Sequence, residues 1–131
     1  MSNKIDKILA EISAGELFDK ITILEIKRSK ISNKEKLDDI QKELSSLKET
    51  VNKYIPDQNS ISNYVNDLKN INLKLWDIED GKRAAEKEKK FDDKFIELAR
   101  NVYKFNDERA KIKLAINTVL GSNIKEVKSH E

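Results

Sequence analysis

Apolar side chains recur at alternating steps of three and four residues along four stretches of this chain. In an α-helix such steps place one apolar residue per turn on a single face, the pattern of helices that pack side by side. The pattern therefore predicts an all-α fold, either an antiparallel four-helix bundle or two long helical hairpins with coiled-coil-like packing. The stripes are Leu17, Ile21, Leu24, Arg28 and Ile31; Leu37, Ile40, Leu44, Leu47, Val51 and Tyr54; Ile61, Tyr64, Leu68, Ile71, Leu75, Ile78 and Lys82; and Phe95, Leu98, Val102, Phe105, Arg109, Ile112, Ile116 and Val119.

Start and stop signals agree with these stripes. Ser13 and Glu16 have the spacing of a capping box, and so do Ser32 and Glu35. Further signals that bound helices are Pro56, Asp92 or Asp93, and Gly121. We therefore predict a single helical domain over residues 1–121, with helices at about 14–31, 33–54, 61–89 and 93–120, and a flexible tail over residues 122–131.

Residues 1–12 and Gly81 are the less regular parts of the pattern. Ile5, Ile8, Leu9 and Ile12 fit a short additional helix before Ser13. A glycine inside a helix costs on the order of 1 kcal/mol relative to alanine, so the third helix can break locally at Gly81.

Composition excludes several classes of protein. Charged residues make up 38% of the chain and apolar residues 37%, but the net charge is only +2 and the apolar residues are regularly spaced, which argues against disorder. Basic and acidic residues alternate, so nucleic-acid binding is not expected. The chain has no cysteine for disulfides or thiolate chemistry. No stretch approaches the ~20 apolar residues of a membrane span, and the N-terminus lacks a signal-like apolar core, so we expect a cytoplasmic protein.

The second predicted hairpin is longer than the first. At about 1.5 Å per residue, its helices of roughly 28 residues would span on the order of 42 Å. The longer hairpin is therefore expected to extend beyond the shorter one and to expose part of its apolar seam. A second copy commonly covers such a surface, so we expect a homodimer.

A mixed aromatic and polar patch is predicted on this longer hairpin. A second stripe beside the apolar one brings Trp76 and Glu79 on one helix near Tyr103 and Asn106 on the other. Mixed patches of this kind are typical of pockets and interfaces. The alternative is a flank of the core with hydrogen-bonded aromatic tips.

Charged residues occupy or flank the seams. Arg28 and Arg109 stand where an apolar residue is expected, so each must reach solvent or meet a carboxylate. A buried pair of this kind specifies register more often than it performs catalysis. His130 is the only histidine, which excludes an imidazole cluster within one chain. Candidate partner carboxylates are Glu16, Asp19, Glu25, Asp77, Glu79, Asp80, Glu97, Asp107 and Glu108.

Two acid pairs raise the alternative of a metal site. Glu16 and Asp19, like Asp77 and Asp80, are three residues apart and can face one way on a helix. Carboxylates from separate helices suit Mg²⁺ or Mn²⁺, and all-helical nucleotide pyrophosphatases use related pairs. Here the pairs lie much farther apart in sequence, and surface salt bridges are the simpler interpretation.

Three segments have distinctive sequences: GELFDKITILEIK at 15–27, LWDIED at 75–80 and FIELARNVYKFNDERA at 95–110. Together they resemble an uncharacterised bacterial family catalogued as a domain of unknown function. The resemblance implies an all-helical domain and transfers no activity and no functional residue.

Two functions of different classes follow from the sequence. The first is a protein-interaction or scaffold module that self-associates. The second is an enzyme or ligand-binding protein with helix-borne carboxylates around a divalent metal or a small molecule. The candidate binding residues for either are Glu16, Asp19, Trp76, Asp77, Glu79, Asp80, Tyr103, Asn106, Asp107 and Arg109.

Overall fold

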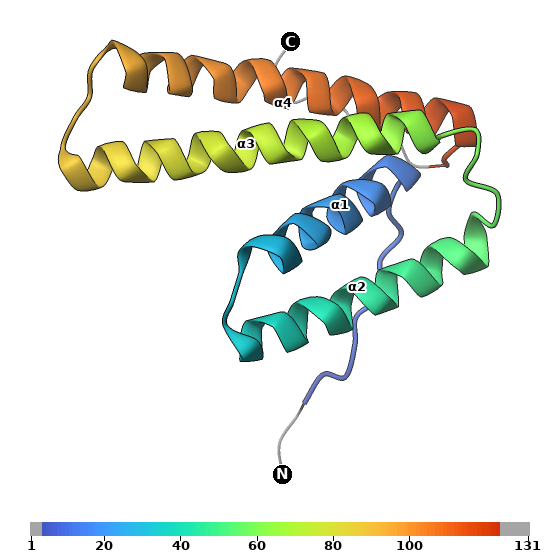
Figure 1. The fold of residues 1–131 in the computed structure, drawn as a ribbon. Helices are drawn as coiled ribbons and strands as arrows, with labels where there is room; N and C mark the ends of the chain where they lie inside the picture. The colour runs from blue at the N-terminus through green and yellow to red at the C-terminus, as the bar shows by residue number, and fades with distance from the viewer. Residues whose placement is uncertain (1–3, 124–131) are drawn as a thin grey trace.

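The computed structural model describes residues 4–123 and confirms the all-α prediction (Figure 1). The part of the chain that it describes contains four helices and no strand. Each bound lies within one residue of the range predicted from the sequence. The helices are α1 (Ala14–Lys30), α2 (Lys34–Tyr54), α3 (Ser62–Glu88) and α4 (Asp93–Leu120).

Side-chain caps account for most of these helix starts. The Ser13 hydroxyl accepts a hydrogen bond of 3.1 Å from the Glu16 N–H at the start of α1, as the capping box predicted. The prediction for α2 was wrong by one residue, because Asn33 and not Ser32 is the N-cap: its side chain accepts from the Lys36 N–H at 3.0 Å. Asparagine is at least as good an N-cap as serine, so the later of two adjacent candidates can start the helix.

The ends and interiors of the long helices also follow local signals. Asp92 caps α4 by accepting from the Phe95 N–H at 3.2 Å. Gly121 follows α4 with a φ of 63°, the left-handed conformation that glycine adopts without steric cost. Helix α3 continues through Gly81 without a break.

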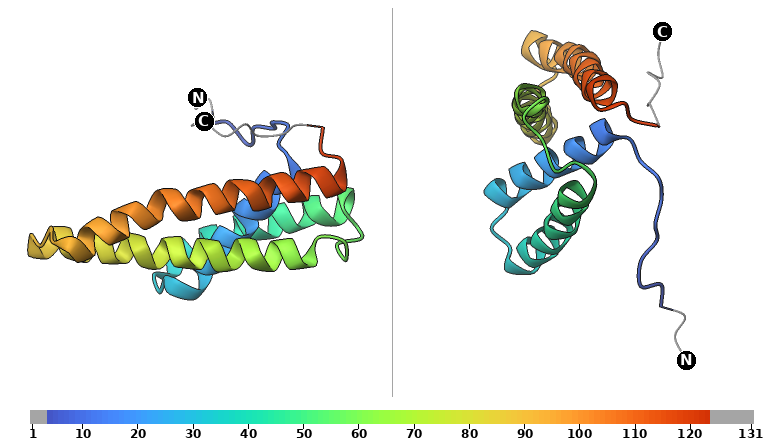
Figure 2. Two further views of the ribbon diagram at one scale, coloured as in Figure 1. Left: turned by 90° about the horizontal axis from the view of Figure 1, so that it is seen from above. Right: turned by 90° about the vertical axis from the view of Figure 1, so that its right-hand side faces the viewer.

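The four helices form two antiparallel hairpins that meet through α1 (Figures 1 and 2). Helix α1 packs against each of the other three helices, whereas α2 packs against α1 alone. The core fills the space between the hairpins, and its buried members include Leu17, Phe18, Leu24, Leu44, Val51, Ile61, Leu68 and Ile116. The outer half of the α3–α4 hairpin extends beyond α1 and α2, so it consists of two helices only (Figure 1).

The segment before α1 differs from the prediction. Residues 4–12 are not helical, and they lead away from the helices (Figure 2). The predicted short helix is therefore wrong for these residues. A segment of this length has too few hydrogen bonds to form a stable helix in water unless its apolar face packs against something.

Residues after α4 connect back to the start of α1. The Ser122 hydroxyl accepts a hydrogen bond of 3.2 Å from the Ala14 N–H. The backbone N–H of Ser122 donates to the Asn117 carbonyl at 2.8 Å. Ser122, which we assigned to the tail, thus ties the two helix ends together. The remainder of the predicted tail from residue 124 onward, including His130, lies outside the described residues.

No helix in residues 4–123 is both long enough and apolar enough to cross a membrane.

Candidate functional site

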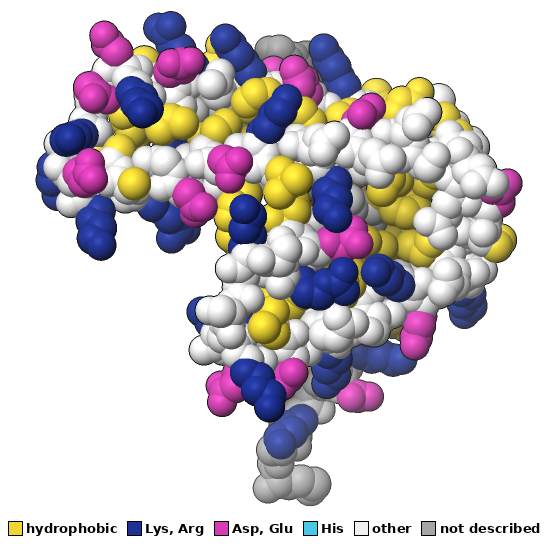
Figure 3. Space-filling view, viewed as in Figure 1, with side chains coloured by type: hydrophobic (Ala, Val, Ile, Leu, Met, Phe, Trp, Pro, Cys, Tyr) yellow, Lys and Arg dark blue, Asp and Glu magenta, His cyan; other side chains and the backbone are white. Residues whose placement is uncertain are grey.

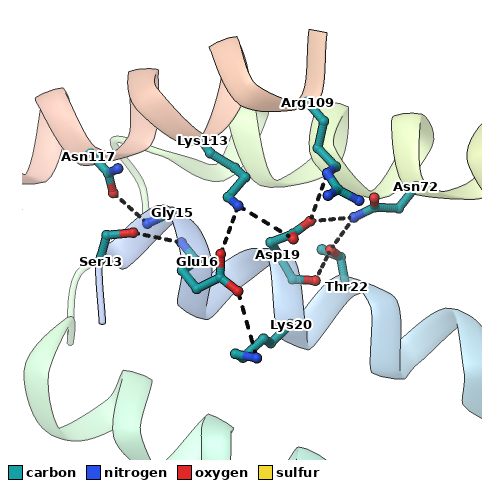
Figure 4. Close-up of polar contacts among 10 residues, drawn as sticks. All are labelled: Ser13, Gly15, Glu16, Asp19, Lys20, Thr22, Asn72, Arg109, Lys113 and Asn117. Atoms are coloured by element: carbon teal, nitrogen blue, oxygen red, sulfur yellow. Dashed lines mark hydrogen bonds and ion pairs between the residues drawn. The ribbon is translucent and has the colours of Figure 1, made fainter. Parts of the chain in front are cut away.

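Polar side chains from three helices meet where α1 crosses the α3–α4 hairpin (Figure 4). Most of them are buried at this crossing. We call this group the polar cluster; its members are Glu16, Asp19 and Thr22 on α1, Asn72 on α3, and Arg109, Lys113 and Asn117 on α4.

Asp19 and Lys113 are the buried ionic centre of the cluster. Their exposed fractions are only 4% and 6%. The Lys113 ammonium lies 2.8 Å from the Glu16 carboxylate and 3.8 Å from that of Asp19. On its other side Asp19 lies 4.0 Å from Nε of Arg109. Two carboxylates and two cations therefore alternate, an arrangement that offsets the cost of removing each charge from water.

Neutral groups complete the hydrogen bonding of this centre. The Asn72 amide donates to the Asp19 carboxylate at 2.9 Å and to the Thr22 hydroxyl at 3.0 Å. The Thr22 hydroxyl in turn donates to the Asp19 carbonyl at 2.9 Å. Within residues 4–123 every buried side-chain nitrogen and oxygen has a hydrogen-bond partner. The cluster is therefore a closed network, which favours a structural role over a reacting group.

Gly15 lets α1 approach α4 closely enough for the cluster to form. Its N–H donates to the Asn117 side chain at 2.6 Å. A Cβ atom at this position would lie only 2.5 Å from the Lys113 backbone carbonyl. Any larger residue would therefore separate the two backbones.

The structure brings together only some of the residues predicted from the sequence. Glu16, Asp19 and Arg109 join the polar cluster, and Arg109 meets a carboxylate as expected for a seam arginine. Arg28 takes the other predicted course: it is exposed, and its guanidinium donates to the Gln41 side chain at 3.3 Å.

Sequence reasoning missed four members of the cluster. Asn72 and Asn117 could have been noticed, because each is a polar residue on the helix face that lies beside the apolar stripe. Lys113 lies one turn after Arg109, on the same face of α4. Thr22 gave no signal, since a threonine on a helix flank is ordinary.

The other predicted residues lie elsewhere. Asp77, Glu79 and Asp80 are exposed on α3, where Glu79 forms an intrahelical ion pair of 3.6 Å with Arg83. Trp76 is half-buried and Tyr103 is exposed. Asn106 and Asp107 are half-buried on α4.

The two acid pairs do not form a recognisable metal site. In the described part of the chain no three acidic, histidine or cysteine side chains are placed to hold a metal ion. Glu16 and Asp19 instead pair with Lys113.

A ligand that binds only the folded state raises the thermal midpoint of unfolding. Because Glu16 and Asp19 are engaged with Lys113, we expect millimolar Mg²⁺ or Mn²⁺ to shift that midpoint by less than about 1 °C. Differential scanning fluorimetry with a Ca²⁺ control measures this. A saturable rise with either ion would revive the metal alternative.

These features define an all-helical protein built from two hairpins around a buried ionic network. Residues 8–131 match the model of DUF6165, a family of unknown function, and the chain belongs to this family. Comparison with curated proteins and with solved structures gave no significant match.

Proposed function

We propose that this protein is an interaction or scaffold module that self-associates through the outer half of the α3–α4 hairpin. The observation that carries the proposal is a change in burial along one seam. Where α1 covers the hairpin, Leu68 and Ile116 are fully buried. In the outer half Ile78 is still buried, but Leu75, Leu98 and Val102 are only half-buried.

A stripe on α4 enlarges this apolar surface. Ile96, Ala99 and Tyr103 follow steps of three and four, so they share one face of the helix. All three are exposed, with Ile96 at 46% and Tyr103 at 58%. The same outer half carries apolar patches between its charged side chains in Figure 3. An apolar surface rimmed by charges is typical of a protein–protein interface, and a two-fold dimer would cover two such surfaces at once.

The polar cluster supports a binding role in a different way. It holds α1 across one end of the hairpin, so the outer half projects as an arm beyond the other two helices (Figure 1). Its carboxylates and cations are engaged with one another. The exposed arm, and not the cluster, therefore offers the surface for a partner.

Serine substitution of the stripe tests this proposal. We expect the wild-type protein to form dimers at tens of micromolar and Ile96→Ser with Tyr103→Ser to weaken the dimer at least about tenfold, since burying each large apolar side chain contributes ~1.5–3 kcal/mol. Sedimentation velocity over a concentration series measures the change.

Glu97→Ser with Glu108→Ser provides the matched control, because both glutamates are exposed on the same helix. This control is expected to dimerise like wild type. A wild-type protein that stays monomeric throughout, or equal association of all three proteins, would contradict the proposal.

A further inference from the structure

A groove of about 320 Å³ lies among α1, α2 and the start of α3, in the region where Figure 3 shows a hollow with apolar walls. Its volume is within the ~300–1,000 Å³ typical of ligand sites. Glu25 and Lys48 are 3.8 Å apart and form a charged rim. The apolar lining comes from Phe18, Ile21, Val51 and Val65, and Asn52 and Gln58 add neutral polar side chains.

The same chain carries an apolar segment before α1 whose large side chains are exposed. Its Glu11 carboxylate accepts a hydrogen bond of 3.0 Å from the Asn123 side chain. Ile5, Ile8 and Leu9 are strongly exposed, with Leu9 at 84%, and Ile12 is also exposed. Their spacing would place all four on one face if the segment were helical. The family model begins at residue 8, so most of this apolar face belongs to the region that defines the family.

We propose that residues 5–12 of one copy fold into an amphipathic helix that docks in the groove of a second copy. This inference rests on the proposed function in one respect, that two copies of the chain associate. It adds a specific ligand and a specific receptor site. Reciprocal docking would fill both grooves of a two-fold dimer and close the assembly.

The position of the segment explains why the partner is a second copy. Ser13 is buried and caps α1, so the point where the segment leaves the fold is fixed. From there residues 4–12 run along the side of the molecule away from the groove, as the right-hand view of Figure 2 shows when compared with Figure 3. A helix of this length extends on the order of 13 Å, too short to pass around α2 to the other face.

The chemistry of the two surfaces also agrees. Branched aliphatic side chains from a helix fit an apolar groove, the mode by which many short amphipathic helices are recognised. On the predicted helix Asp6 flanks the apolar face beside Leu9, and Glu11 flanks it beside Ile8. These acids would lie near a rim that carries Lys48, which is about half exposed. Docking also supplies the packing surface that the isolated segment lacks.

The test uses a labelled peptide of residues 1–13 and the full-length chain with Ile8→Asp and Leu9→Asp, whose own segment is disabled. We expect saturable binding by fluorescence anisotropy and a gain of helical circular dichroism. A peptide carrying the same two aspartates is expected to bind at least about tenfold more weakly, since two buried apolar contacts are lost.

Groove variants of that receptor give the complementary result. Val65→Glu places a charge in the lining, and Asn52→Tyr narrows the groove from an exposed position that spares the core. Each is expected to weaken peptide binding at least about tenfold, with folding checked by thermal melts. Asn63→Glu, an exposed change on α3, is expected to bind the peptide normally.

The outcomes separate this inference from the proposed function. Absent peptide binding, or equal binding by the aspartate peptide, overturns the docking inference even if the Ile96 and Tyr103 variant still loses its dimer. If the Ile8 and Leu9 variant loses its dimer while the Ile96 and Tyr103 variant keeps it, the result supports the inference and contradicts association through α4. If the wild-type chain stays strictly monomeric while the segment-disabled variant binds the peptide, the segment occupies its own groove, which also overturns the inference.

Discussion

Lys113→Met is expected to lower the free energy of unfolding by about 3 kcal/mol, because breaking a buried ion pair costs ~3–5 kcal/mol. Methionine keeps most of the volume of the side chain but removes the cation that lies between the carboxylates of Glu16 and Asp19. The buried Asp19 would then depend on the more distant Arg109 and on Asn72. Urea unfolding followed by circular dichroism measures the loss.

Two further variants identify the cause of that loss. Lys111→Met changes an exposed lysine on the same helix and is expected to stay within about 0.5 kcal/mol of wild type. Asp19→Asn should lower the free energy of unfolding less in the Lys113→Met background than in wild type, by at least about 1 kcal/mol. The reason is that in this background the substitution removes a carboxylate that has already lost its lysine partner. Additive costs, or a stable Lys113→Met protein, would show that the cluster does not depend on this pair.

Gly15→Ala is expected to destabilise the fold by about 2–3 kcal/mol, although alanine is the better helix former. The added Cβ would lie 2.5 Å from the Lys113 carbonyl, and a backbone atom cannot move aside without shifting α4. The shift would also weaken the hydrogen bond from the Gly15 N–H to Asn117. A lower urea midpoint with an unchanged m-value would be the expected observation.

Gly81→Ala is the matched control for this prediction. Its Cβ would lie 3.0 Å from Cδ1 of Leu98, the mobile end of a side chain that can rotate. We expect a change within about 1 kcal/mol of wild type, because the helix propensity gained offsets the contact. If the two alanine variants behave alike, the close approach of α1 to α4 is not what requires Gly15.

The polar cluster and the exposed arm have a common physical origin in the placement of α1. Because α1 lies across only the inner half of the α3–α4 hairpin, it buries charges there and leaves the outer seam half open (Figures 1 and 4). A perturbation of the cluster is therefore expected to alter the position of α1 and, through it, the groove that Phe18 and Ile21 line.

Part of the candidate site was accessible to sequence reasoning. The seam position of Arg109 required either solvent or a carboxylate, and Asp19 is the carboxylate that it meets. The identity of that partner was not accessible, since nine acids were candidates. The short helix assigned to residues before Ser13 was wrong because periodicity reports an apolar face but not whether a surface exists to cover it.

Local interactions determined the helices, their ends and their hairpin pairing, because periodicity, caps and short connections act between residues close in the chain. Only the tertiary structure decided which polar residues meet: Asn72 and Asp19 are 53 positions apart, and Lys113 and Glu16 are 97 apart. The crossing of α1 over the hairpin sets those contacts, and at Gly15 it brings the two backbones so close that a Cβ would lie 2.5 Å from the Lys113 carbonyl. The physical reason is that a helical stripe specifies which face is buried but not which partner buries it.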